Sequence, residues 1–297
     1  MESLNDFANF SISENSVFVD SKQSSMTKSI VKFYGKNNQL IVENGVKIVN
    51  SKIEFFGNNS IVYISKNKNL VKINTAVYEN NVLFIGENVY FNGNLSVILS
   101  EEKNVLIGSD CLISFGVWIR TADPHLIYDC DTKSRINPSL SVLIGKHVWI
   151  GQQVMILKGA TISSGSIVGA SSLVPNKQIN MNECWAGNPV KLVKRNIFWD
   201  SRSVHRFTKE TAQPFNRCES EEYIFKEDRT MSFLKKLDSV EANNIKRKLD
   251  LILEERKISL DTLIKKTQIS TDKISTEVST ERKSLLNEFF KLFRRKF

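Results

Sequence analysis

Six aliphatic residues recur at intervals of six in the middle of the chain without interruption: Ile144, Ile150, Ile156, Ile162, Val168 and Val174. Small or compact residues stand four positions after each of the first five: Val148, Val154, Ala160, Ser166 and Ser172. A period of six suits neither a lone α-helix nor a two-faced strand. It predicts a β-solenoid in which three short faces make one coil of about 18 residues, so that the aliphatic residues of successive coils stack into a continuous core.

The same phase is visible upstream at Ile107, Ile113 and Ile119, and it breaks where the next apolar residue is due. About a dozen residues, from His125 to Asn137, are predicted to loop out before the repeat resumes. Long loops on a regular scaffold are disproportionately functional, so this loop is the first place to look for chemistry.

The rest of the chain divides by composition. Residues 1–29 are rich in Ser and Asn and are expected to be irregular, whereas 30–199 form the solenoid. Within it, 30–106 are expected to be irregular coils with Asn and Gly at the corners, where positive φ is tolerated, and 107–199 the catalytic coils with the loop at 125–137. Apolar residues at helical spacing in 239–257 and 285–297 predict that 200–297 is a helical appendage.

Composition narrows the class of protein. The four cysteines are scattered without CxxC pairs, which is typical of reduced thiols in a cytoplasm and favours neither a disulfide framework nor a zinc site. Glu2 and Asp6 stand where a secretory leader would be basic, and no segment reaches the roughly 18 apolar residues of a transmembrane helix. The expected location is therefore cytoplasmic.

The formal net charge of +9 is uneven: residues 201–297 hold 22 Lys and Arg against 16 Asp and Glu, so most of the excess lies in the last third. Acidic polymers, anionic lipid and phosphorylated cofactors are all compatible with such a charge. Because no base-reading motif accompanies it, we expect no nucleic-acid partner.

Three histidines are candidates for a general base, which needs a pKa near neutral. His125 stands where the repeat breaks, and Asp123 precedes it at a distance suited to fixing the imidazole tautomer or supporting the loop. The alternative is a polar loop histidine without a role. His147 lies inside a regular hexad and is expected to face outward from a coil, and His205 lies outside the repeats.

The segment from Ile113 to Ile197 resembles the hexapeptide-repeat O-acetyltransferases of the maltose/galactoside acetyltransferase superfamily. The resemblance is greatest to the branch that modifies capsular polysaccharide and polysialic acid. It is carried by five motifs, which are Val117 to His125 (VWIRTADPH), Arg135 to Pro138 (RINP), Val142 to Gly151 (VLIGKHVWIG), Ile167 to Ala170 (IVGA) and Ala186 to Lys191 (AGNPVK).

This resemblance implies a left-handed parallel β-helix, acetyl-CoA as donor, no metal, and His125 as general base. Trp149 of the VWIG motif would line the active site, with an aromatic plug at a coil corner as the alternative. A backbone N–H just after that motif, from Gln152 or Gly151, would stabilise the oxyanion.

Coenzyme A contacts are implied for Gly169 and Ala170 beside the pantetheine arm and for Lys191, Lys194 and Arg195 at the phosphates. These three cations are also compatible with a simple solvated face. Relatives often have Val-Thr-Lys-Asp after the last coil, whereas this chain has Val174-Pro175-Asn176-Lys177, so a nucleotide contact expected there is missing or displaced.

The resemblance further implies a homotrimer with sites between neighbouring subunits. For residues 281–297, a stripe of Phe and Leu among Lys and Arg has two interpretations: peripheral contact with anionic membrane at the inner face of the bacterial inner membrane, or packing on another helix.

The leading functional hypothesis is O-acetylation of a bacterial surface glycan, in particular a capsular polysaccharide that contains sialic acid. The alternatives are N- or O-acetylation of a small or nucleotide-linked sugar, and a non-catalytic solenoid scaffold. No Gly-rich phosphate loop follows a strand, as a nucleotide-binding domain would require. Three scattered histidines disfavour a zinc-dependent hydratase on the same fold.

Overall fold

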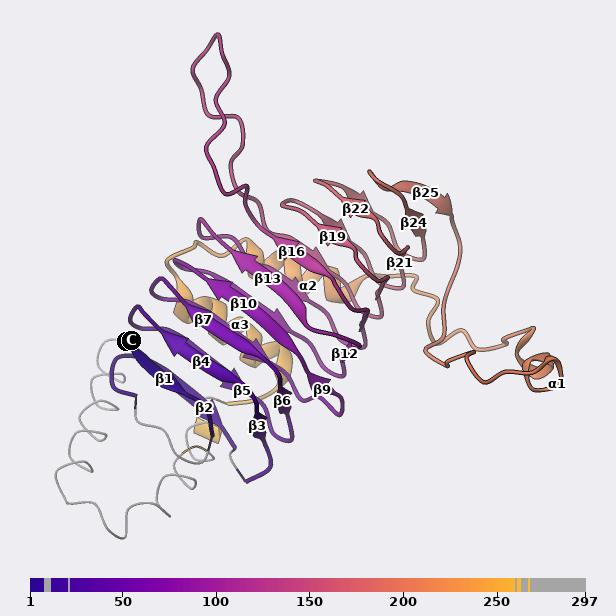
Figure 1. Ribbon diagram of the computed structural model, residues 1–297, viewed down its shortest axis with the longest axis horizontal. Helices are drawn as coiled ribbons and strands as arrows, with labels where there is room; N and C mark the ends of the chain where they lie inside the picture. Colours follow the sequence, from indigo (N-terminus) through magenta and orange to yellow (C-terminus); the bar gives the residue numbers. More distant parts are fainter. Residues whose placement is uncertain (8–11, 21, 260, 263–266, 268–297) are drawn as a thin grey trace.

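Successive strands lie in turn on the three faces of a prism, and most of them pair with the strand three positions later in the chain (Figure 1). The computed structural model describes residues 1–7, 12–20, 22–259, 261–262 and 267. Pairing between these strands is parallel except at the two ends of the solenoid, where β1 (Glu2–Leu4) pairs with β4 (Ile30–Phe33) and β24 (Cys184–Ala186) with β25 (Lys191–Lys194) in antiparallel orientation. The core is therefore one column of side chains that runs the length of the prism.

Face A consists of β1 (Glu2–Leu4), β4 (Ile30–Phe33), β7 (Lys52–Phe55), β10 (Ile73–Val77), β13 (Leu95–Leu99), β16 (Trp118–Arg120), β19 (Met155–Ile156) and β22 (Leu173–Val174). Face B consists of β2 (Ser16–Val19), β5 (Gln39–Val42), β8 (Ile61–Ile64), β11 (Val82–Ile85), β14 (Val105–Ile107), β17 (Val142–Ile144), β20 (Thr161–Ile162) and β23 (Gln178–Ile179).

Face C carries two sheets in succession. The first contains β3 (Ser25–Thr27), β6 (Lys47–Val49) and β9 (Leu70–Val71), and the second contains β12 (Tyr90–Phe91), β15 (Leu112–Ile113), β18 (Trp149–Ile150), β21 (Ile167–Val168), β24 (Cys184–Ala186) and β25 (Lys191–Lys194).

The six-residue repeat corresponds to the regular coils of the second half. Ile144 pairs with Ile162 and Ile156 with Val174, each 18 residues apart, and all six aliphatic residues of the repeat are at most 1% exposed. In the first half the coils are longer but also regular. On face A, Val31 pairs with Ile53 across 22 residues, and the next two coils have the same length. The expectation of irregular coils over 30–106 was wrong in this respect, because a 22-residue period does not divide into hexads.

Asparagines occupy the corners of these longer coils, as expected. Asn37, Asn59 and Asn80 have φ of +58°, +53° and +55°. Asparagine tolerates this left-handed conformation better than most residues because its short polar side chain hydrogen-bonds locally.

The N-terminal segment contains strands, contrary to the expectation that 1–29 is irregular. β1, β2 and β3 lie within it, and β2 pairs in parallel with β5. Val17 and Val19 are buried in the same core as the later coils. Strands of three or four residues between Ser- and Asn-rich turns are too short to show a periodicity of their own, so composition alone hid them.

Helices lie behind face B (Figure 1). α2 (Arg229–Asp238) and α3 (Ile245–Arg256) pack on it through a second hydrophobic cluster, in which Tyr63, Phe84 and Leu106 meet Leu234 and Ile252. Face-B strands such as β8 and β11 are buried on both sides as a result, which is typical of strands that are apolar at every position.

The C-terminal region is less helical than expected. Between β25 and α2 the chain runs through a projecting segment with only α1 (Lys209–Ala212) and the 3₁₀ turn η1 (Gln213–Phe215). α3 begins at Ile245 rather than near 239, because the preceding residues turn between α2 and α3. The stripe predicted over 281–297 lies outside the described residues. Among the described residues no helix is long and apolar enough to cross a membrane.

Candidate active site

The break in the repeat is an insertion between β16 and β17, at the corner where face A meets face B (Figure 1). Ile119 pairs with Ile156, 37 residues later, instead of the 18 of the regular coils, so the coil holds 19 additional residues. We refer to residues 121–141 as the inserted loop. The expectation of about a dozen residues was too small, because Thr121 and Ser139 are buried like ordinary coil residues and mask the ends of the insertion.

Beyond its base the inserted loop is a hairpin that stands away from the prism. Tyr128 and Arg135 form an antiparallel bridge, and the Ile136 N–H donates to the Ile127 carbonyl at 2.9 Å. Four apolar side chains on it are about half exposed: Leu126, Ile127, Tyr128 and Ile136. An exposed apolar group of this kind marks a surface that contacts something else.

The base of the loop is tied to the preceding coil by charge. Arg135 donates from both Nη atoms to the Glu101 carboxylate at 2.8 Å, and the Ser139 hydroxyl donates to the same carboxylate. The Arg135 guanidinium, with Ser139, lowers the pKa of Glu101 to about 2. This bidentate geometry is the most directional form of ion pair, so it fixes where the hairpin leaves the corner.

Asp123 is held by a second set of contacts at the same corner. Its Oδ2 accepts from Lys158 Nζ at 2.6 Å and from Asn137 Nδ2 at 3.1 Å, and Lys158 is the first cause of the lowered pKa of Asp123. Asn137 also donates to the His125 carbonyl at 2.8 Å and accepts from the Ile127 N–H at 2.9 Å. These contacts hold the backbone on both sides of His125.

The His125 side chain is exposed, and no described residue hydrogen-bonds its ring. Of the two roles considered for Asp123, its observed contacts are those of loop support. Lys158 and Asn137 were not singled out from the sequence. The repeat contains the signal for Lys158, because residue 158 stacks one coil above residue 121 once the insertion is counted.

Trp149 lies on face C, in β18, and points outward while Ile150 points into the core. It is 39% exposed and belongs to a column of outward side chains on this face. Tyr90 and Leu112 come before it in the column, and Ile167 comes after it. The side chain is therefore available to a ligand on face C.

The two amides proposed for the oxyanion differ in availability. The Gly151 N–H already donates to the Val168 carbonyl at 2.8 Å, which removes it as a free donor. No described residue accepts from the Gln152 N–H. The sequence left both open, and of the two only the Gly151 N–H is committed to the ladder hydrogen bond of the coil.

The glycines of this corner are required by stacking. A Cβ on Gly151 would come within 2.6 Å of the Ala170 nitrogen, and one on Gly169 within 2.8 Å of the Ala186 Cβ. Their small size therefore has a packing cause in the coil itself, whereas Ala170 is exposed at the corner.

The three cations proposed for phosphate contact lie on or just after β25, at the end of face C. Lys191 and Lys194 are exposed. Arg195 Nε donates to Glu183 at 3.2 Å, so part of its charge is already balanced. In the divergent corner after the last coil, Lys177 stands 5.2 Å from the centroid of the Trp185 ring.

The candidate residues thus form two groups. His125 and Asp123 lie at the corner between faces A and B, whereas Trp149, Gln152, Ala170 and Lys191 lie on face C or its edge with face A. In a three-sided prism each corner is opposite one face, and the corner of the inserted loop is opposite face C. A single chain therefore does not bring the two groups together.

His147 was expected to face outward from a coil, and it is nevertheless buried. Its imidazole lies between Trp199 and Tyr223, with ring centroids 3.9 and 3.8 Å away and nearly parallel planes. Its Nε2 is 3.0 Å from the Trp199 carbonyl, and Trp199 Nε1 donates to the His147 carbonyl. The side chain does point outward from the coil, but the chain beyond the solenoid returns over it.

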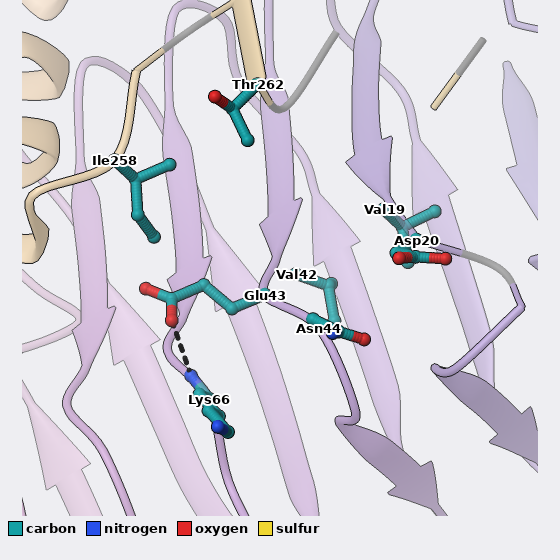
Figure 2. A pocket seen from close by; sticks show the side chains of 8 residues that line it. All are labelled: Val19, Asp20, Val42, Glu43, Asn44, Lys66, Ile258 and Thr262. Carbon is teal, nitrogen blue, oxygen red and sulfur yellow. Dashed lines mark hydrogen bonds between the residues drawn. The ribbon is translucent and has the colours of Figure 1, made fainter. Parts of the chain in front are cut away.

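A cavity of about 240 Å³ lies far from both groups, between the first coils and the chain after α3 (Figure 2). Glu43 at its wall is already bound to Tyr63 and Arg256, and Figure 2 shows its contact with the Lys66 N–H. The lining is Val19, Asp20, Val42, Glu43, Asn44, Lys66, Ile258 and Thr262. None of the candidate residues reaches this cavity.

Known proteins place the chain among acetyltransferases. It is 34% identical over 171 residues to a polysialic acid O-acetyltransferase of Neisseria meningitidis, covering 58% of this chain and 79% of that one. It is 35% identical over 138 residues to the polysialic acid O-acetyltransferase of Escherichia coli O1:K1 / APEC, covering 46% of this chain and 44% of that protein.

Two solved structures have the same fold. The structure of a polysialic-acid-specific acetyltransferase has a TM-score of 0.59 at 32% identity, covering 68% of this chain and 94% of that chain. A second polysialic acid O-acetyltransferase has a TM-score of 0.54 at 28% identity, covering 67% and 93%. No family model matches the chain. The chain belongs to the hexapeptide-repeat O-acetyltransferase family, with the left-handed parallel β-helix that the resemblance implied, and it is an O-acetyltransferase.

Proposed function

We propose that this protein transfers the acetyl group of acetyl-CoA to hydroxyls of a bacterial surface glycan, a capsular polysaccharide that contains sialic acid. One observation carries the proposal: the solenoid holds the histidine of the inserted loop by Asp123, Asn137 and Lys158, in a chain 34% identical to a polysialic acid O-acetyltransferase. The acceptor class follows from that relative and from the basic net charge of the chain.

In the proposed mechanism the His125 imidazole accepts the proton of the acceptor hydroxyl as its oxygen attacks the thioester carbon. The new C–O bond forms, the carbonyl oxygen takes the negative charge, and the Gln152 N–H donates to it. The C–S bond then breaks and the thiolate leaves, taking up the proton from the imidazolium. No covalent acetyl-enzyme is required.

The donor would lie on face C, with its phosphates at the exposed Lys191 and Lys194 and its thioester near Trp149 and Ala170. Since His125 is on the opposite corner of the same chain, the site would be completed by the inserted loop of a second copy. The exposed apolar hairpin supports this, and a cyclic trimer would repeat the contact three times.

Face B of the solenoid is covered by α2 and α3, which leaves faces A and C for assembly. Each of these faces carries outward apolar residues in register. On face A, Trp118 pairs with Met155, and the two side chains are each more than 40% exposed. Such surfaces are those that oligomers bury.

The test is release of free thiol from acetyl-CoA in the presence of a panel of capsular polymers and small sugars. His125→Ala is expected to lower kcat by about 100-fold or more, the range of a lost general base. His205→Ala, at an exposed histidine outside the loop, is the matched control and should keep kcat. Full turnover of His125→Ala would refute the mechanism. Thiol release only with small or nucleotide-linked sugars would refute the polymeric acceptor. Failure to bind coenzyme A would refute the transferase and leave the hypothesis of a non-catalytic scaffold.

A further inference from the structure

The inserted loop rests on a strained corner of the preceding coil. Residues 100–104 connect β13 to β14 where face A meets face B, and we call them the supporting corner. Two consecutive residues in it, Glu101 and Glu102, have φ of +49° and +61°. Residues with a Cβ avoid this left-handed region, so they adopt it only where their surroundings hold them there.

The inserted loop binds the supporting corner at its start, its base and its end. At the start, the Ser100 N–H donates to the Thr121 hydroxyl at 2.8 Å. Glu101 holds the base of the loop through its bidentate ion pair. At the end, the Asn104 N–H donates to the Ser141 hydroxyl at 2.9 Å. The direction in which the loop leaves the prism therefore depends on the conformation of this corner.

The helices behind face B bind the same corner from the other side. The Asn104 side chain is buried, and its Nδ2 donates to the carboxylate of Asp238, the last residue of α2, at 2.7 Å. Its Oδ1 accepts from the Val82 N–H at 2.9 Å. Asn104 thus contacts the end of the inserted loop through its main chain and α2 through its side chain.

A buried lysine on α3 makes the second contact. Lys248 is 0% exposed, and its Nζ donates to the carbonyls of Asn80 at 3.3 Å and Ala242 at 3.2 Å. Asn80 in turn donates from its Nδ2 to the Glu102 carboxylate at 2.6 Å. Burial lowers the pKa of Lys248 to about 8, and the charges of Asp238 and Glu102 oppose this shift. Lys248 therefore fixes the residue that holds Glu102 in its left-handed conformation.

These contacts connect the helices to the inserted loop without a gap. Asp238 binds the supporting corner directly, Lys248 binds it through Asn80, and the corner binds the loop. We propose that Asp238 and Lys248 are positioning residues for catalysis, which act through the supporting corner to fix where the inserted loop places His125. This inference rests on the proposed function, because it takes the His125 imidazole as the reacting group.

Four variants of the full chain test the proposal. Asp238→Ala removes the acceptor of Asn104, whereas Asp238→Asn keeps an oxygen in the same place. Lys248→Met exchanges the buried charge for an apolar side chain of similar length. Arg256→Met is the matched control, because Arg256 lies at the other end of α3 and pairs with Glu43 at 2.8 Å, where face B meets face C.

Three measurements are made on each variant. Thiol release from acetyl-CoA gives kcat and the KM for acetyl-CoA, and urea denaturation gives the free energy of unfolding. The hairpin is followed independently by a nitroxide spin label on Cys130, which is exposed in the inserted loop. Cys184 and Cys218, the other cysteines that are not buried, are replaced by serine in every chain that carries the label.

Asp238→Ala and Lys248→Met are expected to lower kcat about three- to tenfold and to make the label more mobile. This loss is smaller than the roughly 100-fold cost of a 1 Å displacement, because the loop keeps its own contacts with the corner. The KM for acetyl-CoA should not change, since the proposed donor site lies on face C. Asp238→Asn should recover most of kcat.

Arg256→Met should lose stability, because it leaves the buried Glu43 carboxylate without its partner, but it should keep the wild-type kcat and label spectrum. Wild-type kcat in both Asp238→Ala and Lys248→Met would overturn the proposal. So would an equal loss of kcat in Arg256→Met, or a loss of kcat in the helix variants with an unchanged label spectrum. If the wild type releases no thiol with any acceptor, the proposed function fails, and the spin-label comparison decides by itself whether the helices fix the loop.

Discussion

His147 differs from the other histidines because the chain encloses it. Burial lowers the pKa of its imidazole, and the contact with the Trp199 carbonyl opposes this only in part. The neutral ring is thus favoured in the folded state, while the unfolded chain takes up a proton near the ordinary value of 6.5. Since the unfolded state then binds more protons, stability must fall as the pH drops below about 6.5.

We therefore expect the free energy of unfolding to decrease between pH 7.5 and pH 5.5, a range in which the carboxylates of Glu101 and Asp123 stay ionised. His147→Gln removes the titrating ring. The variant should be less stable than wild type at pH 7.5, but its free energy of unfolding should change less across this pH range. Urea denaturation at each pH measures both. His205→Gln, at an exposed position, should retain the wild-type slope, and parallel curves for wild type and His147→Gln would contradict the assignment.

At the scale of the element, the inserted loop depends on a few polar ties. The Glu101–Arg135 pair and the Asp123–Lys158 pair each connect the loop to a different neighbouring coil. Neither tie follows from local sequence, because the partners are 34 and 35 residues apart. Both hold the segment that carries His125, so they affect its position more than the stability of the solenoid.

Arg135→Gln is expected to lower kcat about tenfold or more with little change in melting temperature, because a displacement of the order of 1 Å in a reacting group is costly whereas a surface loop adds little to global stability. Steady-state kinetics and thermal denaturation measure the two effects. Lys36→Gln breaks a more exposed pair with Glu14 away from the loop and should leave both kcat and melting temperature unchanged. A large loss of melting temperature in Arg135→Gln would show that the tie serves the fold instead.

The helices on face B show another limit of local pattern. The strands β8 (Ile61–Ile64) and β11 (Val82–Ile85) are apolar at every position, which predicts cover on both sides. The spacing in 239–257 predicted a helix, but not where it packs. Only the tertiary contacts of Leu234 and Ile252 show that α2 and α3 of the same chain cover the outer side of face B.

At the scale of the whole molecule, the two halves of the proposed site lie on opposite sides of the prism. An active site that contains both His125 and Trp149 must then combine two copies. His125→Ala and Trp149→Ala, each impaired alone, should complement one another when they are unfolded together, mixed in equal amounts and refolded.

In a random trimer with three equivalent interfaces, about a quarter of the sites would have both residues intact, so about a quarter of wild-type turnover should return. Thiol release measures it. The control is each variant refolded alone, which should regain nothing. Absence of recovery in mixed oligomers shown to contain both chains would contradict a shared site.

The sequence by itself determined the solenoid, the position of its break and the histidine in that break, because each coil repeats the same local stacking requirement, which Ile144, Ile150 and Ile156 meet in turn. Tertiary structure alone decided the rest. Lys158 meets Asp123, Trp199 and Tyr223 enclose His147, and the Gly151 N–H is consumed by Val168, because these contacts join residues far apart in sequence that only the winding of the chain brings together.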